Sequence, residues 1–132
     1  MNRREDTSSE TGFGETPHEQ RRWDREEVVI LVVTYFKMKY YPVDKQEESY
    51  YGISNFLRNR EEMISGAPVS ETFRNYAGIR MQTARIRCLD PDTDLSGMQG
   101  TKMQKEVVME YLSDPEKVTA EAREIYFRYT QL

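Results

Sequence analysis

"WDREEVVILVVTYFKM", residues 23–38, contains the strongest apolar run of the chain. Asp24 can cap a helix, and Glu26 and Glu27 would then lie in its first turn, where the helix dipole favours anions. The β-branched residues of the run also suit a buried strand, and periodicity alone does not separate the two structures. The length from Asp24 to Lys39, about four helical turns, favours a helix that is buried on most sides.

Apolar residues recur at helical spacing in the segments that follow. Pro42 ends the first helix, because the residue before a proline avoids the α region. We expect helices over residues 46–63 and 76–89, a short helix around Phe73, and two closing helices after a loop at 90–100. The predicted fold is all-α, a compact bundle of about five helices with a helix-turn-helix-like core. The predicted core residues are Val29, Leu31, Val32, Phe36, Ile53, Leu57, Ile79, Ile86, Val107 and Ile125.

The first 22 residues, "MNRREDTSSETGFGETPHEQRR", differ in composition from the rest of the chain. They combine Gly, Ser, Thr, Pro and mixed charge, with Phe13 as their only large apolar residue. Such a segment buries too little apolar surface to offset the entropy lost on ordering. We therefore predict a disordered tail over residues 1–22 and one helical domain over residues 23–132.

The composition also predicts where in the cell the protein is found. The apolar run at 28–36 is too short for a membrane span, which needs about 20 residues, and the first segment lacks the apolar stretch of a secretory signal. The single cysteine, Cys88, has no partner for an intramolecular disulfide and fits a reducing compartment. The expectation is a cytoplasmic protein that does not contact a membrane.

"TFRNYAGIRMQTARIRCL", residues 72–89, is a basic segment in an acidic chain. It holds four arginines and no acid, whereas the whole chain has a formal charge of −4, so the remainder sums to −8. Its Arg, Gln and Thr side chains can donate to phosphates and base edges, which predicts contacts with DNA. The structural alternative is that the arginines pair with acids elsewhere, and exposed pairs of that kind contribute about 0–1 kcal/mol. The candidate DNA-binding residues are Arg74, Asn75, Arg80, Gln82, Thr83, Arg85, Arg87 and Lys102.

Two features of the candidate surface have a second interpretation. Asn75 can contact adenine through its amide, but an Asn near the start of a helix is more often an N-cap. The tyrosines near the first predicted loop can stack on bases, pack on a protein partner, or lie half-buried in the core. A protein-interaction or inhibitor module with an acidic, tyrosine-rich surface is therefore the alternative to DNA binding. These tyrosines are Tyr40, Tyr41, Tyr50 and Tyr51.

The sequence offers no set of residues for catalysis. The single histidine, His18, lies in the predicted tail, which removes the common nucleophile–base pairs and any His-rich metal site. No Gly-rich phosphate loop is present, and adjacent carboxylates such as Glu61 and Glu62 do not face each other on a helix. We expect no enzymatic activity, no cofactor and no metal.

A set of single residues also forms a pattern along the chain: a Trp, an acidic pair and a Tyr, then a Phe-Arg-Asn segment with Gly and Met, then Leu-Asp-Pro and a Gly-containing loop. This pattern resembles the N-terminal helical, Myb- or SANT-like DNA-recognition domain of bacterial HNH-type restriction endonucleases, including modification-dependent ones. It spans roughly residues 23–130. The matching residues are Trp23, Glu26, Glu27, Tyr35, Phe73, Arg74, Asn75, Gly78, Met81, Leu89, Asp90, Pro91 and Gly97.

The resemblance implies a helical domain that reads DNA, modified or unmodified, in a restriction or defence system, with the helix at 76–88 as the contact element. Two features of this chain differ from those endonucleases. One histidine cannot build an HNH nuclease site, and an acidic net charge opposes phosphate binding. The chain is then a domain excised from a longer protein, a stand-alone relative, or a decoy or inhibitor built on the same fold.

Three aspartates resemble the start of a calcium-binding loop. Asp90, Asp92 and Asp94 have the correct spacing, but the sixth position is Leu95, where a glycine is needed, and the twelfth is Thr101, where a bidentate Glu is needed. We therefore expect no binding of calcium at physiological concentrations. Calorimetry that detected micromolar affinity for calcium would contradict this expectation.

Overall fold

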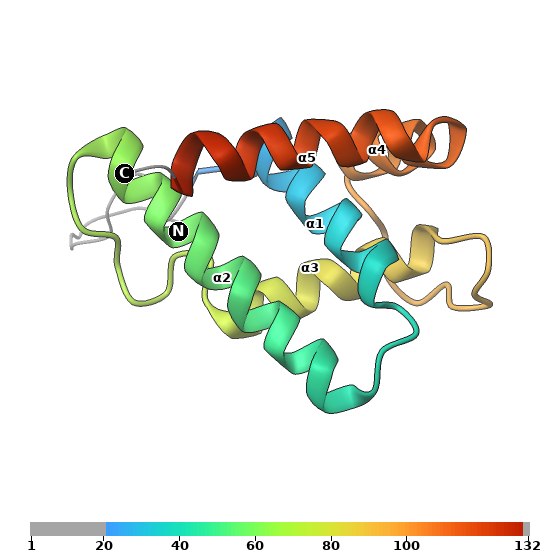
Figure 1. Cartoon of the computed structure of the whole chain (residues 1–132). Coiled ribbons are helices and arrows are strands. Elements are labelled where there is room, and N and C mark those ends of the chain that lie inside the picture. The colour runs from blue at the N-terminus through green and yellow to red at the C-terminus, as the bar shows by residue number, and fades with distance from the viewer. Residues whose placement is uncertain (1–20, 131–132) are drawn as a thin grey trace, which may run out of the picture.

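The computed structural model describes residues 21–130, and this part of the chain consists of α-helices and their connections, without a strand (Figure 1). The all-α prediction is therefore confirmed. In chain order the helices are α1 (Arg25–Met38), α2 (Val43–Ser65), α3 (Tyr76–Leu89), α4 (Lys102–Ser113) and α5 (Pro115–Thr130). α1 lies in the middle and contacts all four other helices, and α5 crosses it at the top of Figure 1.

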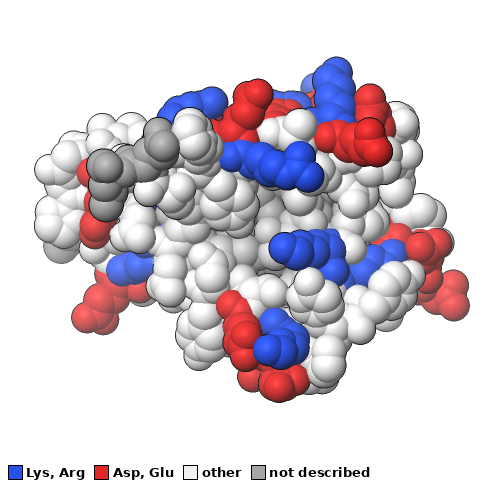
Figure 2. Space-filling model, viewed as in Figure 1, with Lys and Arg blue, Asp and Glu red and all other residues white. Residues whose placement is uncertain are grey.

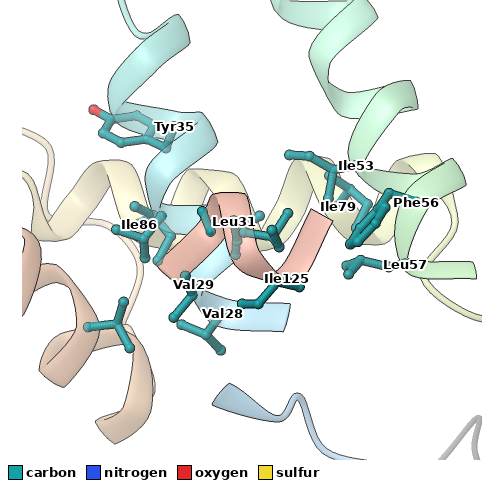
Figure 3. Packing of buried hydrophobic residues seen from close by; sticks show 14 of the residues in the cluster. Val28, Val29, Leu31, Tyr35, Ile53, Phe56, Leu57, Ile79, Ile86 and Ile125 are labelled. Atoms are coloured by element: carbon teal, nitrogen blue, oxygen red, sulfur yellow. The ribbon is translucent and has the colours of Figure 1, made fainter. Parts of the chain in front are cut away.

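α1 is a helix rather than a strand because the other helices surround its apolar run. Residues 28–32 are all at most 1% exposed, so successive residues on every side of the helix are buried. Figure 3 shows Ile79 and Ile86 of α3 and Ile125 of α5 close to this part of α1. The start of the helix is a capping box: the Asp24 side chain accepts from the Glu27 backbone N–H, and the Asp24 N–H donates to the Glu27 carboxylate.

The predicted core is close to the observed one. Nine of the ten predicted residues are buried, whereas Phe36 is half-buried and stacks on Tyr111 with ring centroids 4.4 Å apart. α1, α2 and α3 contact one another pairwise and form a three-helix core. α4 and α5 pack against α1 and against each other.

Two boundaries differ from the prediction. α2 begins directly after Pro42 and ends at Ser65, and the left-handed backbone of the next residue, the C-cap Gly66 (φ 73°), allows its N–H to bond the carbonyl of Glu62. The short helix expected around Phe73 is absent, and residues 71–74 form a turn instead. The reason is the positive φ of 46° at Arg74, a left-handed conformation that cannot continue a right-handed helix.

The predicted tail was too long at its C-terminal end. Arg21 donates to Glu27 at 3.0 Å and to Glu61 at 2.8 Å, so the folded domain begins before Trp23. The remainder of the predicted tail, residues 1–20 with His18, lies outside the described residues. None of the described helices combines the length and the apolar character needed to cross a membrane.

Gly52 in the interior of α2 provides a test of helix energetics. A Cβ at this position would meet no atom within 4 Å, so no packing contact requires a glycine there. Glycine inside a helix is about 0.5–1 kcal/mol less favourable than alanine, and Gly52→Ala should raise the free energy of unfolding by about that amount. Urea denaturation measures the change. Gly78→Ala is the contrast: its Cβ would lie 3.2 Å from Asn75 Oδ1, and we expect a smaller gain or a loss.

Candidate nucleic-acid interface

α3 is the predicted DNA-contacting helix, and its first residues are fixed by local hydrogen bonds. Asn75 is the N-cap: its Oδ1 accepts from the backbone N–H of Gly78 at 2.9 Å. The cap interpretation is therefore confirmed, and the acceptor oxygen that a contact with adenine would need is already occupied. Tyr76 follows and stacks on Tyr51 of α2, with ring centroids 4.3 Å apart.

Arg74 was predicted to contact DNA, and this is wrong because the side chain is buried. Its Nε and Nη2 donate to the two carboxylate oxygens of Glu27 at 2.8 and 3.0 Å. The guanidinium also lies over the rings of Trp23 and Phe73, 4.6 and 4.4 Å from their centroids. A side chain enclosed in this way cannot reach a phosphate without breaking the ion pair.

The Glu27–Arg74 pair belongs to a larger ionic cluster at the start of α1. Glu27 is fully buried, and burial alone would raise its pKa, but hydrogen bonds from Arg74 and Arg21 outweigh that effect and hold the pKa below the ordinary value of 4.5. Arg60 of α2, also buried, donates to Asp24 at 2.9 Å and pairs with Glu26. The cluster thus joins α1, α2 and the connection that precedes α3.

Thr83 and Gln82 are likewise engaged within the fold. Thr83 is fully buried and its hydroxyl donates to the carbonyl of Ile79 at 2.8 Å, so its predicted contact with DNA is wrong. Gln82 is half-buried, and its Oε1 accepts from Nε2 of the buried Gln104 at 2.7 Å. This bond ties α3 to the first turn of α4, and it leaves the amide N–H₂ of Gln82 as the group able to donate elsewhere.

The arginines of α3 itself have no acidic partner within the described part of the chain. Arg80 is exposed, Arg85 and Arg87 are half-buried, and none of the three forms an ion pair with another described residue. Arg85 Nη1 donates to the carbonyl of Gln99 at 2.7 Å, while its Nε is buried without a hydrogen-bond partner in the described structure. Residues seven apart differ by only about 20° around a helix, so Arg80 and Arg87 share one edge of α3, and Arg85 lies about 140° from Arg80.

A second edge of α3 faces a hollow that also holds Lys102. This hollow of about 580 Å³ is bordered by Gln82, by Arg22 and Trp23, and by the exposed Lys102 at the first position of α4. Between the two edges, the outward face of α3 carries small or flexible side chains such as Ala77 and Met81. The predicted residues that remain at the surface are therefore Arg80, Gln82, Arg85, Arg87 and Lys102.

The C-terminal end of α3 is held by a second polar cluster. Asp90, the C-cap, is buried, and its Oδ2 accepts from the Tyr35 hydroxyl at 2.7 Å and from Lys39 Nζ at 2.6 Å. Burial would raise the pKa of Asp90, but the hydrogen bonds from Lys39, the Asp92 backbone and Tyr35 hold it below its ordinary value. The first aspartate of the calcium-like spacing is thus a structural group, and residues 21–130 contain no cluster of three or more potential metal ligands.

Comparison of the chain with family models, with curated proteins and with solved structures gave no match. The resemblance to the recognition domain of HNH-type endonucleases therefore stays a prediction from the sequence.

Glu27 and Trp23 are the residues whose structural role the sequence interpretation missed. The sequence analysis placed Glu27 in the first turn of a helix and Trp23 at the start of the domain, and it assigned neither of them a buried contact. One signal was available: Glu27 lies directly before the fully buried residues 28–32, so a helix buried on all sides must bury its carboxylate as well. A buried carboxylate requires a cation, and the nearby arginines were the available partners.

Glu27→Gln should strongly destabilise the domain. The change keeps the shape of the side chain but leaves Arg74 without its buried counter-charge, and breaking a buried pair in this way costs about 3–5 kcal/mol. Urea denaturation at neutral pH measures the loss. Glu48→Gln is the matched control, because Glu48 is exposed and pairs with Lys45 at only 3.8 Å. Its effect should stay within about 0.5 kcal/mol.

The same pair makes stability depend on pH. Because folding lowers the pKa of Glu27, its contribution is complete above the ordinary carboxyl value of 4.5 and is lost as the pH falls through the lowered value. The free energy of unfolding of the wild type should therefore fall as the pH drops below the ordinary carboxyl value. The Glu27→Gln variant should show a shallower dependence, and equal slopes in the two proteins would contradict the role assigned to the pair.

Proposed function

We propose that this domain binds duplex DNA through α3 and acts by binding alone. The observation that carries the proposal is the pair of arginines on one edge of α3, Arg80 and Arg87, neither of which forms an ion pair with another described residue. Other arginines of the described chain are engaged with acids: Arg21, Arg25, Arg60, Arg74 and Arg128. Arg80, Arg85 and Arg87 have no ion pair with a described residue, and they lie on a helix that has no acid of its own.

The acidic net charge of the whole chain opposes DNA binding at α3 less strongly than its value of −4 suggests. Residues 1–20 hold two basic and five acidic residues, a charge of −3, which leaves −1 for residues 21–132 with 17 basic and 18 acidic residues. Charges farther apart than about 8–10 Å are largely screened at physiological salt. A phosphate near α3 therefore responds mainly to the arginines beside it.

The dimensions and side chains of α3 suit a helix in the major groove. The groove is about 12 Å wide and accommodates an α-helix. Arg80 and Arg87 on one edge, and Lys102 on the other, would face the phosphates of the two strands, while the N–H₂ of Gln82 could donate to a base edge. Ala77 and Met81 on the outward face would allow a close approach, and Met81 offers an apolar contact to a thymine methyl.

A protein partner is the second candidate function, because aromatic side chains are exposed beside the α1–α2 connection. Tyr40 is 81% exposed and Tyr51 is 56% exposed, and Val43 is also exposed between them in the sequence. Tyr50, in contrast, is buried in the core. Tyrosines are enriched in protein interfaces, and contacts of this kind depend only weakly on salt.

The salt dependence of DNA binding tests the proposal. Removing one phosphate contact lowers the slope of log affinity against log salt by about 0.9, so Arg80→Gln with Arg87→Gln should lower it by about 1.8. Fluorescence anisotropy with short methylated and unmethylated duplexes, over a series of salt concentrations, measures the slope. Lys105→Gln with Lys117→Gln removes the same charge from exposed positions on α4 and α5 and should leave the slope nearly unchanged.

Two results would end the proposal. One is that the wild-type protein shows no binding to duplex DNA at low salt. The other is that the control pair lowers the slope as much as the α3 pair, since the attraction would then come from net charge and not from α3. Binding of a protein partner that is abolished in a Tyr40→Ala, Tyr51→Ala variant would favour the second candidate.

A further inference from the structure

A groove of about 630 Å³ lies between α1, α2 and α5. Its floor and walls are mostly apolar: Val33 and Met38 of α1, Ile53 of α2, and Ala122 and Tyr126 of α5. Sites for small molecules usually measure about 300–1,000 Å³ and combine apolar walls with a few polar groups. α3 contributes no residue to the lining, so this groove is separate from the candidate nucleic-acid interface.

Among the described residues, the charged side chains that line the groove are two cations. Lys37 extends from α1 and Arg123 from α5, and both are exposed. Neither forms an ion pair in the part of the chain that the structure describes. Figure 2 shows one face of the molecule, on which basic side chains lie around an uncharged area near the middle and acidic side chains lie farther out and beside some of the basic ones. In a chain with more acids than bases, this arrangement attracts an anion.

Gly52 supplies an independent observation. It lies on the wall that α2 contributes to the groove, and a Cβ there would meet no atom within 4 Å. Packing therefore does not require glycine at this helix-interior position, where glycine lowers stability. Its effect on the structure is to leave the wall of the groove open beside Ile53.

We propose that the groove binds a small anionic amphiphile, a carboxylate with an alkyl body, with its head at Lys37 and Arg123 and its body over Val33 and Tyr126. Arginine binds a carboxylate through paired hydrogen bonds, and lysine adds a second positive charge. The hydroxyls of Thr34 and Thr119 also line the groove. A small molecule fits better than an extended acidic peptide, because helical walls have no free backbone groups to bond the backbone of a peptide.

Decanoate is the probe that tests this site in the full chain. Titration at low salt, below the concentration at which decanoate aggregates, should give saturable shifts in the NMR amide signals of Val33, Ile53 and Ala122. Decanol and decyltrimethylammonium have the same alkyl body without the negative charge, and they should bind at least about fivefold more weakly. Higher salt should weaken the binding of decanoate and leave that of decanol unchanged.

Two sets of variants separate the groove from general effects of charge and folding. Lys37→Gln with Arg123→Gln should lower the affinity for decanoate by about tenfold, whereas Lys45→Gln with Lys117→Gln, which removes equal charge outside the groove, should not. Gly52→Phe should fill the groove and abolish binding. The Gly52→Ala variant, with its side chain in open space, provides a folded reference, and both unfolding midpoints are recorded by thermal denaturation.

Several outcomes would overturn the proposal. Equal affinities for decanoate and decanol would mean that the cations do not select an anion. Undiminished binding by a folded Gly52→Phe protein would place the ligand elsewhere. Displacement of decanoate by a synthetic peptide of residues 1–20, which carries five acidic residues and Phe13, would assign the groove to the acidic segment of the chain itself.

Discussion

The buried ion pair between Glu27 and Arg74 is the contact on which the arrangement of the helices depends. It joins the first turn of α1 to the connection in front of α3, two segments 47 residues apart in the chain. A carboxylate without exposure to water requires a cation, so α1 can be buried on all sides only if this connection folds over its start.

The connection is held from the other side by α2: Ser54 donates to the carbonyl of Arg74 at 2.7 Å, and Arg58 donates to that of Phe73 at 2.6 Å. These bonds stabilise the left-handed backbone at Arg74, and the chain enters α3 at the next residue, the N-cap Asn75.

α3 is therefore fixed at both ends by polar side chains of α1. Its start follows the Glu27–Arg74 pair, and its end is the buried Asp90, which accepts from Tyr35 and Lys39. Between these two points, Ile79, Thr83 and Ile86 face the core. A helix held in this way can present its outer surface in a constant orientation. The same arrangement explains why the arginines of the basic segment divide into two groups: Arg74, which precedes the helix, is structural, whereas Arg80 and Arg87, on one edge of the helix, form no ion pair with a described residue.

The two proposed binding surfaces use different helices and different chemistry. The α3 edges offer cations beside a narrow outward face, which suits the regularly spaced phosphates of a duplex. The groove between α1, α2 and α5 offers two cations above an apolar floor, which suits a single negative charge on an apolar body. Both rest on the same condition, namely that many acids of the domain are engaged in ion pairs elsewhere, as in the pairs of Arg25 with Glu110 and Glu121.

The sequence by itself determined the class of the fold and most of the core. The apolar residues at helical spacing, Pro42 and Asp24 were enough for that, because helix formation, capping and termination depend on residues within a few positions of one another. Only the tertiary structure decided which arginines of the basic segment are buried and which are exposed. Four arginines in one segment look alike in sequence, yet one is buried against Glu27 and another donates to the carbonyl of Gln99. The groove could not be predicted from the sequence either, because its lining residues Lys37, Gly52 and Arg123 come from three different helices. In each case the deciding partner is distant in the chain, and burial and ion pairing depend on proximity in space.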